Sequence, residues 1–235
     1  MKIIPIASGS SGNCYIVRLS KYTFMIECGI PLEKIKRAVW NYNIWLTGLD
    51  ACLVSHSHGD HCKAAKDLAK LGVNIYASEE TITALGIEKE NRVRAIDTCK
   101  GLCFMSADIC AFNVEHDAKG TLGFVIQDRI THDRLLYVTD TPYLPVNVDG
   151  ITHLMIEANY DPDIMQENVD NGMNLKRAVR TVKNHMSIET TLQTLEKMDK
   201  SKLKEVWLLH LSRDNAGDDF KKRAQEICGC EVYVA

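Results

Sequence analysis

The stretch Ser55-His56-Ser57-His58-Gly59-Asp60-His61 constrains the fold more than any other part of this sequence. It follows a compact apolar run at residues 51–54 and precedes the alanine- and lysine-rich segment 62–69. A short apolar run bounded by turn residues is typical of a buried strand, and the segment after the stretch has helical composition. The sequence therefore predicts a strand, a tight loop and a helix, with the polar loop at the edge of a sheet.

Three imidazoles and one carboxylate within six residues are hard to explain as packing, and divalent metals take these ligands. Alternation along the chain puts His56 and His58 on one side, where both can reach one ion. Asp60 and His61 fall at the turn into the helix and can reach a second ion. The alternative is a solvated polar loop. The tight turn at Gly59 and the strand before it favour the metal interpretation.

The composition is that of an ordinary soluble globular protein. The chain has 235 residues, of which 46% are hydrophobic and 25% charged, so we expect one domain over residues 1–235. The net charge of −3 excludes a globally basic nucleic-acid binder. It does not exclude a nucleic-acid substrate, because metals and local Lys or Arg side chains can hold phosphates.

The nine cysteines are scattered, their number is odd, and no Cys-x-x-Cys pair occurs. This pattern disfavours a disulfide framework and suits a reducing compartment. The apolar run at the N-terminus is too short for a signal-peptide core, and no stretch is long enough to span a membrane. We therefore expect a cytoplasmic protein with no membrane partner.

Further candidate ligands stand where other apolar runs end. His116 closes a predicted strand beside Asp117, a position that suits the first metal. Asp140 follows another strand and precedes a proline turn; it could bridge two cations or simply begin a turn. Glu157 ends a third strand and is a candidate site carboxylate. His153 lies within that strand and is expected to be structural.

Several other segments carry weaker signals. Residues 8–13 form a Gly- and Ser-rich loop, either a hairpin between strands or a phosphate cradle, and the hairpin is favoured. The predicted helix 174–184 leads to His185 and carries Lys176, Arg180 and Lys183 on one face. That face is either solvated surface or a path for substrate phosphates. Residues 187–190 are similar to a capping box that opens a further helix, and 214–228 predict the last helix.

The order His-x-His-x-Asp-His, present as His56, His58, Asp60 and His61, resembles the signature of the metallo-β-lactamase superfamily. The resemblance covers nearly the whole chain and implies an α/β fold, the four-layer αββα sandwich. It also implies a dinuclear centre, with His56, His58 and His116 on one metal, Asp60, His61 and His210 on the other, and Asp140 between them. The ions are expected to be zinc or manganese, although iron also suits this donor set. A water shared by the two ions would lose a proton near neutral pH and become the nucleophile.

Within the superfamily, the segments 7–13, 156–161, 184–187 and 210–215 are similar to the YycJ-like (WalJ-like) branch. That branch is associated with metal-dependent 5′-to-3′ DNA exonuclease activity. The pair Glu157 and His185 also resembles a pair in the tRNA 3′-processing ribonuclease Z that is tied to proton transfer at the leaving oxygen. The resemblance therefore implies Asp60, Glu157 and His185 as catalytic residues.

Two departures from the family pattern do not change the expected chemistry, but they leave the substrate undetermined. Glu27 occupies the place of an Asp that usually supports a metal-binding His, and residues 184–187 read Asn-His-Met-Ser where the branch usually has Gly-His-Leu-Ser. We expect a metal-dependent phosphodiesterase acting on nucleic acid, in the first place a 5′-to-3′ DNA exonuclease.

Other functions stay open at this point. They are a ribonuclease, a small-molecule hydrolase acting on a cyclic phosphodiester, a thioester or a lactam, and a regulatory module with a vestigial site. The length leaves no room for an inserted domain that clamps the substrate. Loops, the basic helix or a homodimer would have to hold it.

Overall fold

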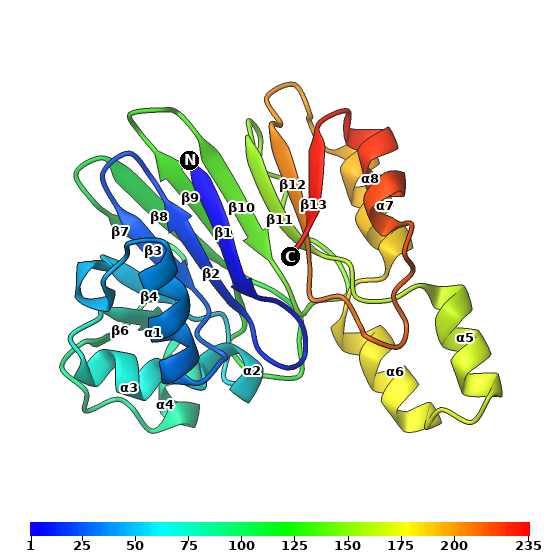
Figure 1. The fold of residues 1–235 in the computed structure, drawn as a ribbon, viewed down its shortest axis with the longest axis horizontal. Coiled ribbons are helices and arrows are strands. Elements are labelled where there is room, and N and C mark those ends of the chain that lie inside the picture. The colour runs from blue at the N-terminus through cyan, green and yellow to red at the C-terminus, as the bar shows by residue number, and fades with distance from the viewer. The chain divides into compact units, whose positions relative to one another are not determined.

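Short runs of β-branched and aromatic residues, separated by Gly, Ser and Pro, form the strands of this protein. The computed structural model describes residues 1–235 (Figure 1). Strands β1 to β6 form a six-stranded sheet in sequential order, and a seven-stranded sheet has the order β13-β12-β11-β10-β9-β8-β7. The strand bounds are β1 Lys2–Ala7, β2 Cys14–Arg18, β3 Thr23–Ile26, β4 Ala51–Leu53, β5 Ile75–Ala77, β6 Val93–Ala95, β7 Leu102–Cys103, β8 Ala107–Asn113, β9 Leu122–Asp128, β10 Arg134–Val138, β11 His153–Glu157, β12 Glu205–Leu209 and β13 Glu231–Val234.

Eight α-helices and one short 3₁₀ helix accompany the strands, and none of them combines the length and the apolar content needed to cross a bilayer. The helix bounds are α1 Leu32–Asn41, η1 Leu46–Gly48, α2 Gly59–Cys62, α3 Ala65–Lys70, α4 Glu79–Leu85, α5 Pro162–Asp170, α6 Leu175–Asn184, α7 Ile188–Lys197 and α8 Phe220–Cys228. All nine cysteines are free.

The chain divides into two compact units by its internal contacts. Unit 1 holds residues 1–113 with two short later segments, 118–122 and 126–132, and unit 2 holds residues 133–235 with 114–117 and 123–125. Strands β1 to β8 and helices α1 to α4 thus belong to unit 1, and β10 to β13 with α5 to α8 belong to unit 2.

In unit 1, β1, β2 and β3 pair antiparallel, whereas β3 to β6 run parallel. The loop 8–13 joins β1 to β2, so the predicted hairpin is confirmed. Apolar side chains of α1 and α3, such as Ile35 and Leu68, pack with Met25 and Cys52 of the sheet into one fully buried core. The stretch after β4 runs into helices, as the sequence predicted, but α2 already begins at Gly59 in place of the predicted tight turn, and a turn at residues 63–64 separates α2 from α3.

In unit 2, strands β10 to β13 are parallel neighbours, with buried faces along β10 and β11. Figure 1 shows α7 and α8 beside each other and beside β13, while α5 and α6 form a separate helical pair. Parallel strands leave their carboxyl ends at one edge of a sheet, and this edge is where ligands usually bind in α/β proteins.

The helices differ from the sequence predictions in three respects. The last helix begins at Phe220 and not at residue 214, because the carbonyl of Asn215 accepts the backbone N–H of Asp161 and holds that segment as a turn. Helix α5 was not predicted, although Asp161 before Pro162 is a helix-start signal. The Ser187 hydroxyl accepts the backbone N–H of Thr190, as expected for an N-cap. A full capping box also needs Glu or Gln as the third helical residue, and that residue here is Thr190.

One glycine of unit 1 sits where no side chain fits. A Cβ atom on Gly29 would lie 1.6 Å from the backbone oxygen of Asp60 and 2.6 Å from the backbone nitrogen of His61. The neighbouring backbone is tied to the same place, since the N–H of Cys28 donates to the carbonyl of His61 at 2.8 Å. The position of the 55–61 stretch thus depends on the missing side chain of Gly29.

We expect Gly29→Ala to lower the free energy of unfolding by about 2 kcal/mol or more, because the clash is with backbone that cannot rotate away. Urea unfolding followed by circular dichroism measures the change. Gly48→Ala is the matched control, since the nearest atom to a Cβ there is 4.0 Å away. Equal stability of the two variants would contradict the close approach of the backbone at Gly29.

His153 is the buried first residue of β11, and its Nδ1 lies 2.7 Å from the Thr152 hydroxyl. Burial lowers the pKa of His153 from 6.5 to about 4, against the opposing effect of Asp133 and with the help of Lys204. The Glu205 carboxylate lies 3.8 Å from its Nε2 and belongs to the same surroundings. The neutral imidazole is therefore the form that the folded protein holds at neutral pH.

The unfolded chain takes up this proton near pH 6.5, and the folded chain takes it up only near pH 4. The contribution of the neutral His153 to the free energy of unfolding is therefore complete above pH 6.5 and declines as the pH falls toward 4. We expect this group to make the protein about 2 kcal/mol less stable at pH 5 than at pH 7. His153→Gln should remove that part of the pH dependence in urea unfolding. The exposed His132, changed to Asn, should leave it intact; identical profiles for wild type and His153→Gln would contradict the assignment.

Candidate metal centre

In unit 1, the candidate ligands are placed by two neighbouring parallel strands. Ile26 of β3 is in register with Leu53 of β4, so Glu27 and the 55–61 stretch leave the sheet at the same edge. His58 is the N-cap residue of the short helix α2, whose first turn holds Asp60 and His61. The parallel pairing therefore brings the whole stretch and Glu27 together.

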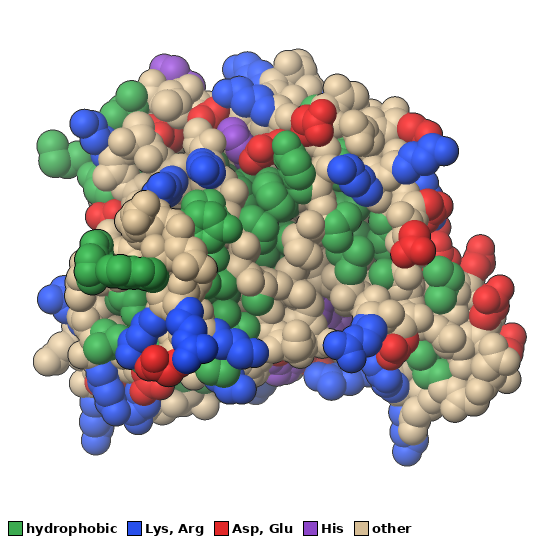
Figure 2. Space-filling model, in the orientation of Figure 1, with side chains coloured by type: hydrophobic (Ala, Val, Ile, Leu, Met, Phe, Trp, Pro, Cys, Tyr) green, Lys and Arg blue, Asp and Glu red, His purple; other side chains and the backbone are tan.

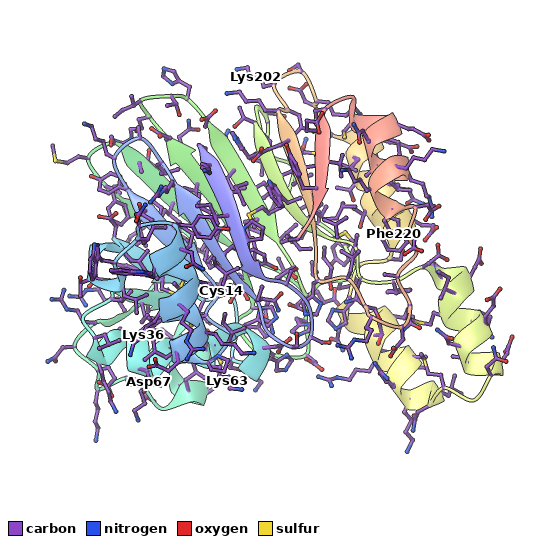
Figure 3. All side chains as sticks on the ribbon, viewed as in Figure 1. Cys14, Lys36, Lys63, Asp67, Lys202 and Phe220 are labelled. Atoms are coloured by element: carbon purple, nitrogen blue, oxygen red, sulfur yellow. The ribbon has the colours of Figure 1, made fainter.

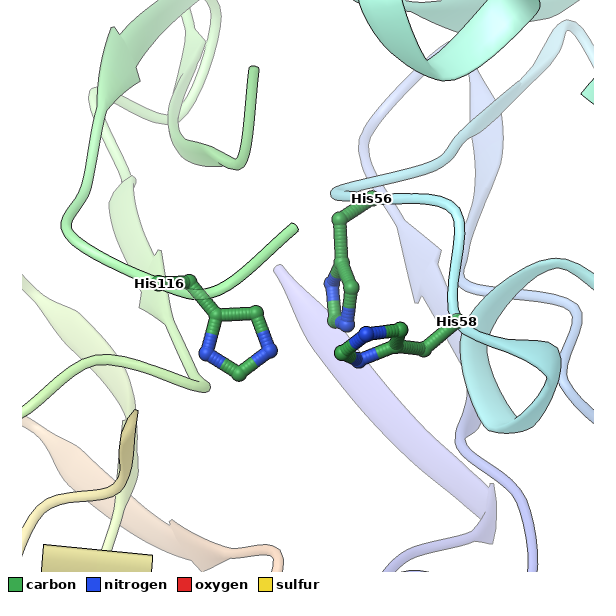
Figure 4. Close-up of side chains that lie close together, drawn as sticks. All are labelled: His56, His58 and His116. Atoms are coloured by element: carbon green, nitrogen blue, oxygen red, sulfur yellow. The ribbon is translucent and has the colours of Figure 1, made fainter. Parts of the chain in front are cut away.

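The imidazoles of this stretch form a compact group. The ring centres of His56 and His58 are 4.7 Å apart, and those of His56 and His61 are 4.1 Å apart. Figure 4 shows the side chains of His56 and His58, both carried by the loop after β4, and also draws His116. A carboxylate oxygen of Asp60 lies 3.6 Å from Nε2 of His61. The four residues predicted from the motif are thus gathered in one place within unit 1.

Glu27 lies under this group and is fully buried. Its two carboxylate oxygens accept the backbone N–H of Ser55 at 3.2 and 3.3 Å, and one of them lies 3.5 Å from Nδ1 of His61. A buried carboxylate that contacts an imidazole fixes the orientation of that ring. Glu27 is thus placed to do what the shorter Asp does in the family pattern.

Asn13 is a supporting residue for which no role was predicted. Its Nδ2 lies 3.1 Å from Nε2 of His61 and donates to the carbonyl of Asp60 at 3.3 Å. Its backbone N–H donates to the same carbonyl at 2.7 Å, and its Oδ1 accepts the N–H of Gly9 and the hydroxyl of Tyr15. The Gly- and Ser-rich hairpin therefore positions Asp60 and His61.

In unit 2, three parallel strands end at the same edge. Asp140 follows β10, Glu157 ends β11 and His210 follows β12, with Glu157 in register with Leu209. His185 joins them from the junction of α6 and α7. Ligand atoms of these four residues all lie within 4.8 Å of one another. The structure thus brings together four residues that the sequence had predicted for the site.

Glu157 is fully buried at the centre of this cluster. One oxygen lies 2.7 Å from Nδ1 of His185 and 3.4 Å from Nδ1 of His210, and the other accepts the backbone N–H groups of Thr141 and Met186. The two imidazoles stack with ring centres 5.2 Å apart and planes 10° apart. Because both oxygens of Glu157 already have donors, this carboxylate fits an orienting role better than that of a ligand.

The charges in this cluster influence one another. Burial works against a charged His185, but the carboxylates of Glu157 and Asp140 outweigh it and raise the pKa of His185 from 6.5 to about 10. Burial likewise opposes the charged form of Glu157, and the neighbouring His185 nevertheless lowers its pKa. In the protein without a metal, the imidazolium and the carboxylates therefore neutralise one another.

His116 is held in unit 2 by the residue that follows it. Asp117 contacts Nε2 of His116 at 3.3 Å, and its backbone N–H donates to Oδ1 of Asn184 at 2.9 Å. Arg180 donates to the Asp117 carboxylate at 2.8 Å. Arg180, which the sequence placed on a face open to phosphates, is therefore engaged by Asp117, and Asn184 replaces the usual Gly with a hydrogen-bonding side chain.

Asn159 is a second supporting residue without a predicted role. Its Nδ2 donates to the carbonyl of His210 at 2.7 Å and lies 3.0 Å from Nδ1 of the same residue. The only local sequence signal for this role is that a polar residue stands two positions after Glu157, where a buried strand ends. Asn13 and Asn159 thus each contact the ring of one candidate ligand, His61 in unit 1 and His210 in unit 2.

Three residues of these clusters have left-handed backbone conformations that favour glycine. The φ angles are 60° at Glu27, 50° at Asp140 and 55° at His210. Each of the three stands directly after or close to the end of a strand, where the turn sets the direction of its side chain. Such conformations cost about 1–3 kcal/mol each and concentrate at functional sites.

The donor sets fit divalent cations. Imidazole nitrogens with carboxylate oxygens are the ligands of zinc, manganese and iron, and sulfur is absent from both clusters. Asp140 is nearly fully buried, with an oxygen 3.7 Å from Nε2 of His210 and 3.1 Å from Nδ1 of His185. Buried clusters of this composition are consistent with a metal site.

Comparison with known proteins shows the family. The family model described as Beta-lactamase superfamily domain matches residues 24–210. A relative from Streptococcus pneumoniae, named Exodeoxyribonuclease WalJ, is 30% identical over 223 residues, which cover 89% of this chain and 81% of that protein. Exodeoxyribonuclease YycJ of Bacillus anthracis is 24% identical over 223 residues, with 89% and 82% covered.

Solved structures agree on the fold. The metallo-β-lactamase fold protein YhfI from Bacillus subtilis matches with a TM-score of 0.74 at 18% identity, over 99% of this chain and 95% of that chain. The short form of human tRNase Z matches with a TM-score of 0.64 at 14% identity, over 100% of this chain and 96% of that chain. The chain belongs to the metallo-β-lactamase superfamily, and the predicted fold class is confirmed.

We expect Glu157→Gln to weaken zinc binding roughly ten- to a hundredfold, because an amide holds the imidazole of His210 less firmly than a carboxylate does. Isothermal titration of the metal-free protein with Zn²⁺ measures the affinity. The exposed Glu196→Gln on α7 is the matched control. Unchanged affinity in Glu157→Gln would show that the carboxylate does not orient a ligand.

Proposed function

We propose that this protein is a metal-dependent phosphodiesterase that hydrolyses nucleic acid, in the first place DNA from its 5′ end. The observation that carries the proposal is the Glu157–His185 pair beside Asp140. The names of the relatives, both exodeoxyribonucleases, support DNA as the substrate. A ribonuclease of the same fold is the nearest alternative.

We further propose that the two clusters contribute to one dinuclear centre and that the two units work as a single domain, since the family model spans residues of both. His56, His58 and His116 would hold one cation, and Asp60, His61 and His210 the other, with Asp140 between them. Two bound divalent cations would polarise a phosphoryl oxygen and lower the pKa of a water. Zinc and manganese are the first choices for both positions.

In this proposal, His185 supplies the proton that the leaving oxygen needs. Glu157 accepts from Nδ1 of His185, so the ring nitrogen left to meet a substrate is Nε2. His185 is also partly accessible, with 21% of its side chain exposed, whereas Glu157 is fully buried. The imidazole can therefore reach a leaving group, and the carboxylate behind it sets its orientation.

Metal-reconstituted protein, with Zn²⁺ or Mn²⁺, tests the function on end-labelled single-stranded and duplex DNA. Stepwise loss of nucleotides from the 5′ end, abolished in Asp140→Ala, is the expected result. Cleavage of RNA in preference to DNA would favour the ribonuclease. Cleavage of bis(p-nitrophenyl) phosphate alone would overturn the nuclease proposal in favour of a small-molecule phosphodiesterase.

The role of His185 has a sharper test in the choice of leaving group. An alkoxide leaving from DNA needs a proton, whereas p-nitrophenolate leaves without one. We expect His185→Ala to slow DNA hydrolysis by about 10²–10⁴-fold and bis(p-nitrophenyl) phosphate hydrolysis by less than about tenfold. Metal content measured by mass spectrometry should stay at the wild-type value. Equal losses on both substrates, together with lost metal, would show that His185 is a ligand.

A further inference from the structure

Two tryptophans of unit 1 are exposed without an evident structural reason. The side chains of Trp40, at the end of α1, and Trp45, just before η1, are 60% and 65% exposed. Their rings meet edge to face, with centres 4.9 Å apart and planes at 87°. In this arrangement much of the ring surface is left open to solvent. Exposed aromatic surface of this extent usually marks a binding site.

The pair stands beside a shallow cavity of about 270 Å³ that joins two helices of unit 1. It is lined by residues of α1 and of the segment that follows it, with Leu71 from the end of α3; the lining residues are Lys36, Val39, Trp40, Ile44, Trp45, Leu46, Thr47 and Leu71. Since Lys36 and Leu71 line the same cavity, the exposed faces of α1 and α3 form one continuous surface.

This surface is strongly basic in a chain whose net charge is −3. Segments 32–41 and 63–70 carry six cations, Lys34, Lys36, Arg37, Lys63, Lys66 and Lys70, against two anions, Glu33 and Asp67. Lys36 pairs with Glu33 at 2.7 Å. The remaining cations exceed the nearby carboxylates. Figure 2 shows Lys and Arg side chains gathered directly beside the exposed apolar group on this face, and Figure 3 labels Lys36, Lys63 and Asp67 there.

The basic row begins at the candidate metal loop. Lys63 is the second residue after His61, and Lys63, Lys66 and Lys70 follow at helical spacing, all exposed. Lys63 lies at the turn between α2 and α3, and from Lys66 to Lys70 the chain advances about 6 Å along α3. The row therefore leads, within unit 1, from the metal-ligating stretch to the cavity beside the tryptophans.

We infer that this α1–α3 surface binds a single-stranded segment of nucleic acid, with unpaired bases stacked on Trp40 and Trp45 and phosphates held by the lysines of α3. Aromatic faces flanked by cations are how proteins hold single strands without reading sequence. A duplex keeps its bases stacked inside and offers nothing to the tryptophans. A protein partner or a second copy of this chain would have to be acidic to match the row. The inference rests on the proposed nuclease function and adds a substrate-holding surface outside the metal clusters.

The three tryptophans of the chain make the surface observable by fluorescence. Trp207 lies in β12 of unit 2, where its ring stacks on that of Tyr233. In Trp207→Phe, all tryptophan emission comes from Trp40 and Trp45. Titration with oligo(dT) in EDTA, which prevents cleavage, should quench this emission, and duplex DNA without overhangs should quench it much less. Absence of quenching by oligo(dT) would overturn the inference.

Substitutions separate stacking from charge. We expect Trp45→Ala to weaken oligo(dT) binding about tenfold. The double variant Lys66→Glu/Lys70→Glu should weaken it at least tenfold and reduce the slope of log affinity against log salt by roughly 0.7 per lost phosphate contact. Lys221→Glu/Lys222→Glu on α8, with the same change of charge, should bind like wild type. All variants should hydrolyse bis(p-nitrophenyl) phosphate at the wild-type rate.

The outcomes distinguish this inference from the function on which it rests. Wild-type protein that degrades DNA, with all variants binding oligo(dT) equally, would overturn the surface and leave the nuclease standing. Quenching by oligo(dT) that is lost in the lysine variants, in a protein that degrades no DNA, would support the surface and overturn the nuclease. Trp45→Ala that converts a dimer to a monomer in sedimentation would assign the surface to a second copy and overturn the inference.

Discussion

A buried carboxylate beneath a group of imidazoles is the interaction on which both clusters depend. Glu27 in unit 1 and Glu157 in unit 2 are fully buried, and a carboxylate in such a place is costly unless hydrogen-bond donors surround it. Each accepts the backbone N–H of the strand or loop beside it and each contacts the Nδ1 of an imidazole. The need to satisfy the carboxylate therefore fixes both the backbone and the ring that a cation would meet.

The candidate ligands were predictable because their signal is local. His56 to His61 form one contiguous stretch, and Asp140 and His210 each follow an apolar run that ends at a sheet edge. Asn13 and Asn159 were not predictable in the same way. Asn13 meets His61 across 48 positions and Asn159 meets His210 across 51, so their role exists only after the chain has folded. Helix α5, by contrast, carried a local signal in Asp161-Pro162 that periodicity alone did not reveal.

Charge was harder to interpret from the sequence than ligand geometry. The basic helix α6 drew attention because it leads to His185, yet Arg180 is engaged by Asp117 and Arg177 by Asp214. Lys63, just before α3, and Lys66 and Lys70 within it are less conspicuous in the sequence, yet none of the three is paired with a carboxylate. Net charge along one helix thus says little until the acidic side chains contributed by other segments are known.

The left-handed backbone at Glu27, Asp140 and His210 has an evolutionary consequence. At each of these positions glycine would relax the main chain, so selection for stability alone would favour the loss of the side chains that define the clusters. A lineage released from the need for this chemistry should therefore drift toward glycine at these three positions first. Such a change to glycine would relieve the main chain at the same step that removes the chemistry of the clusters.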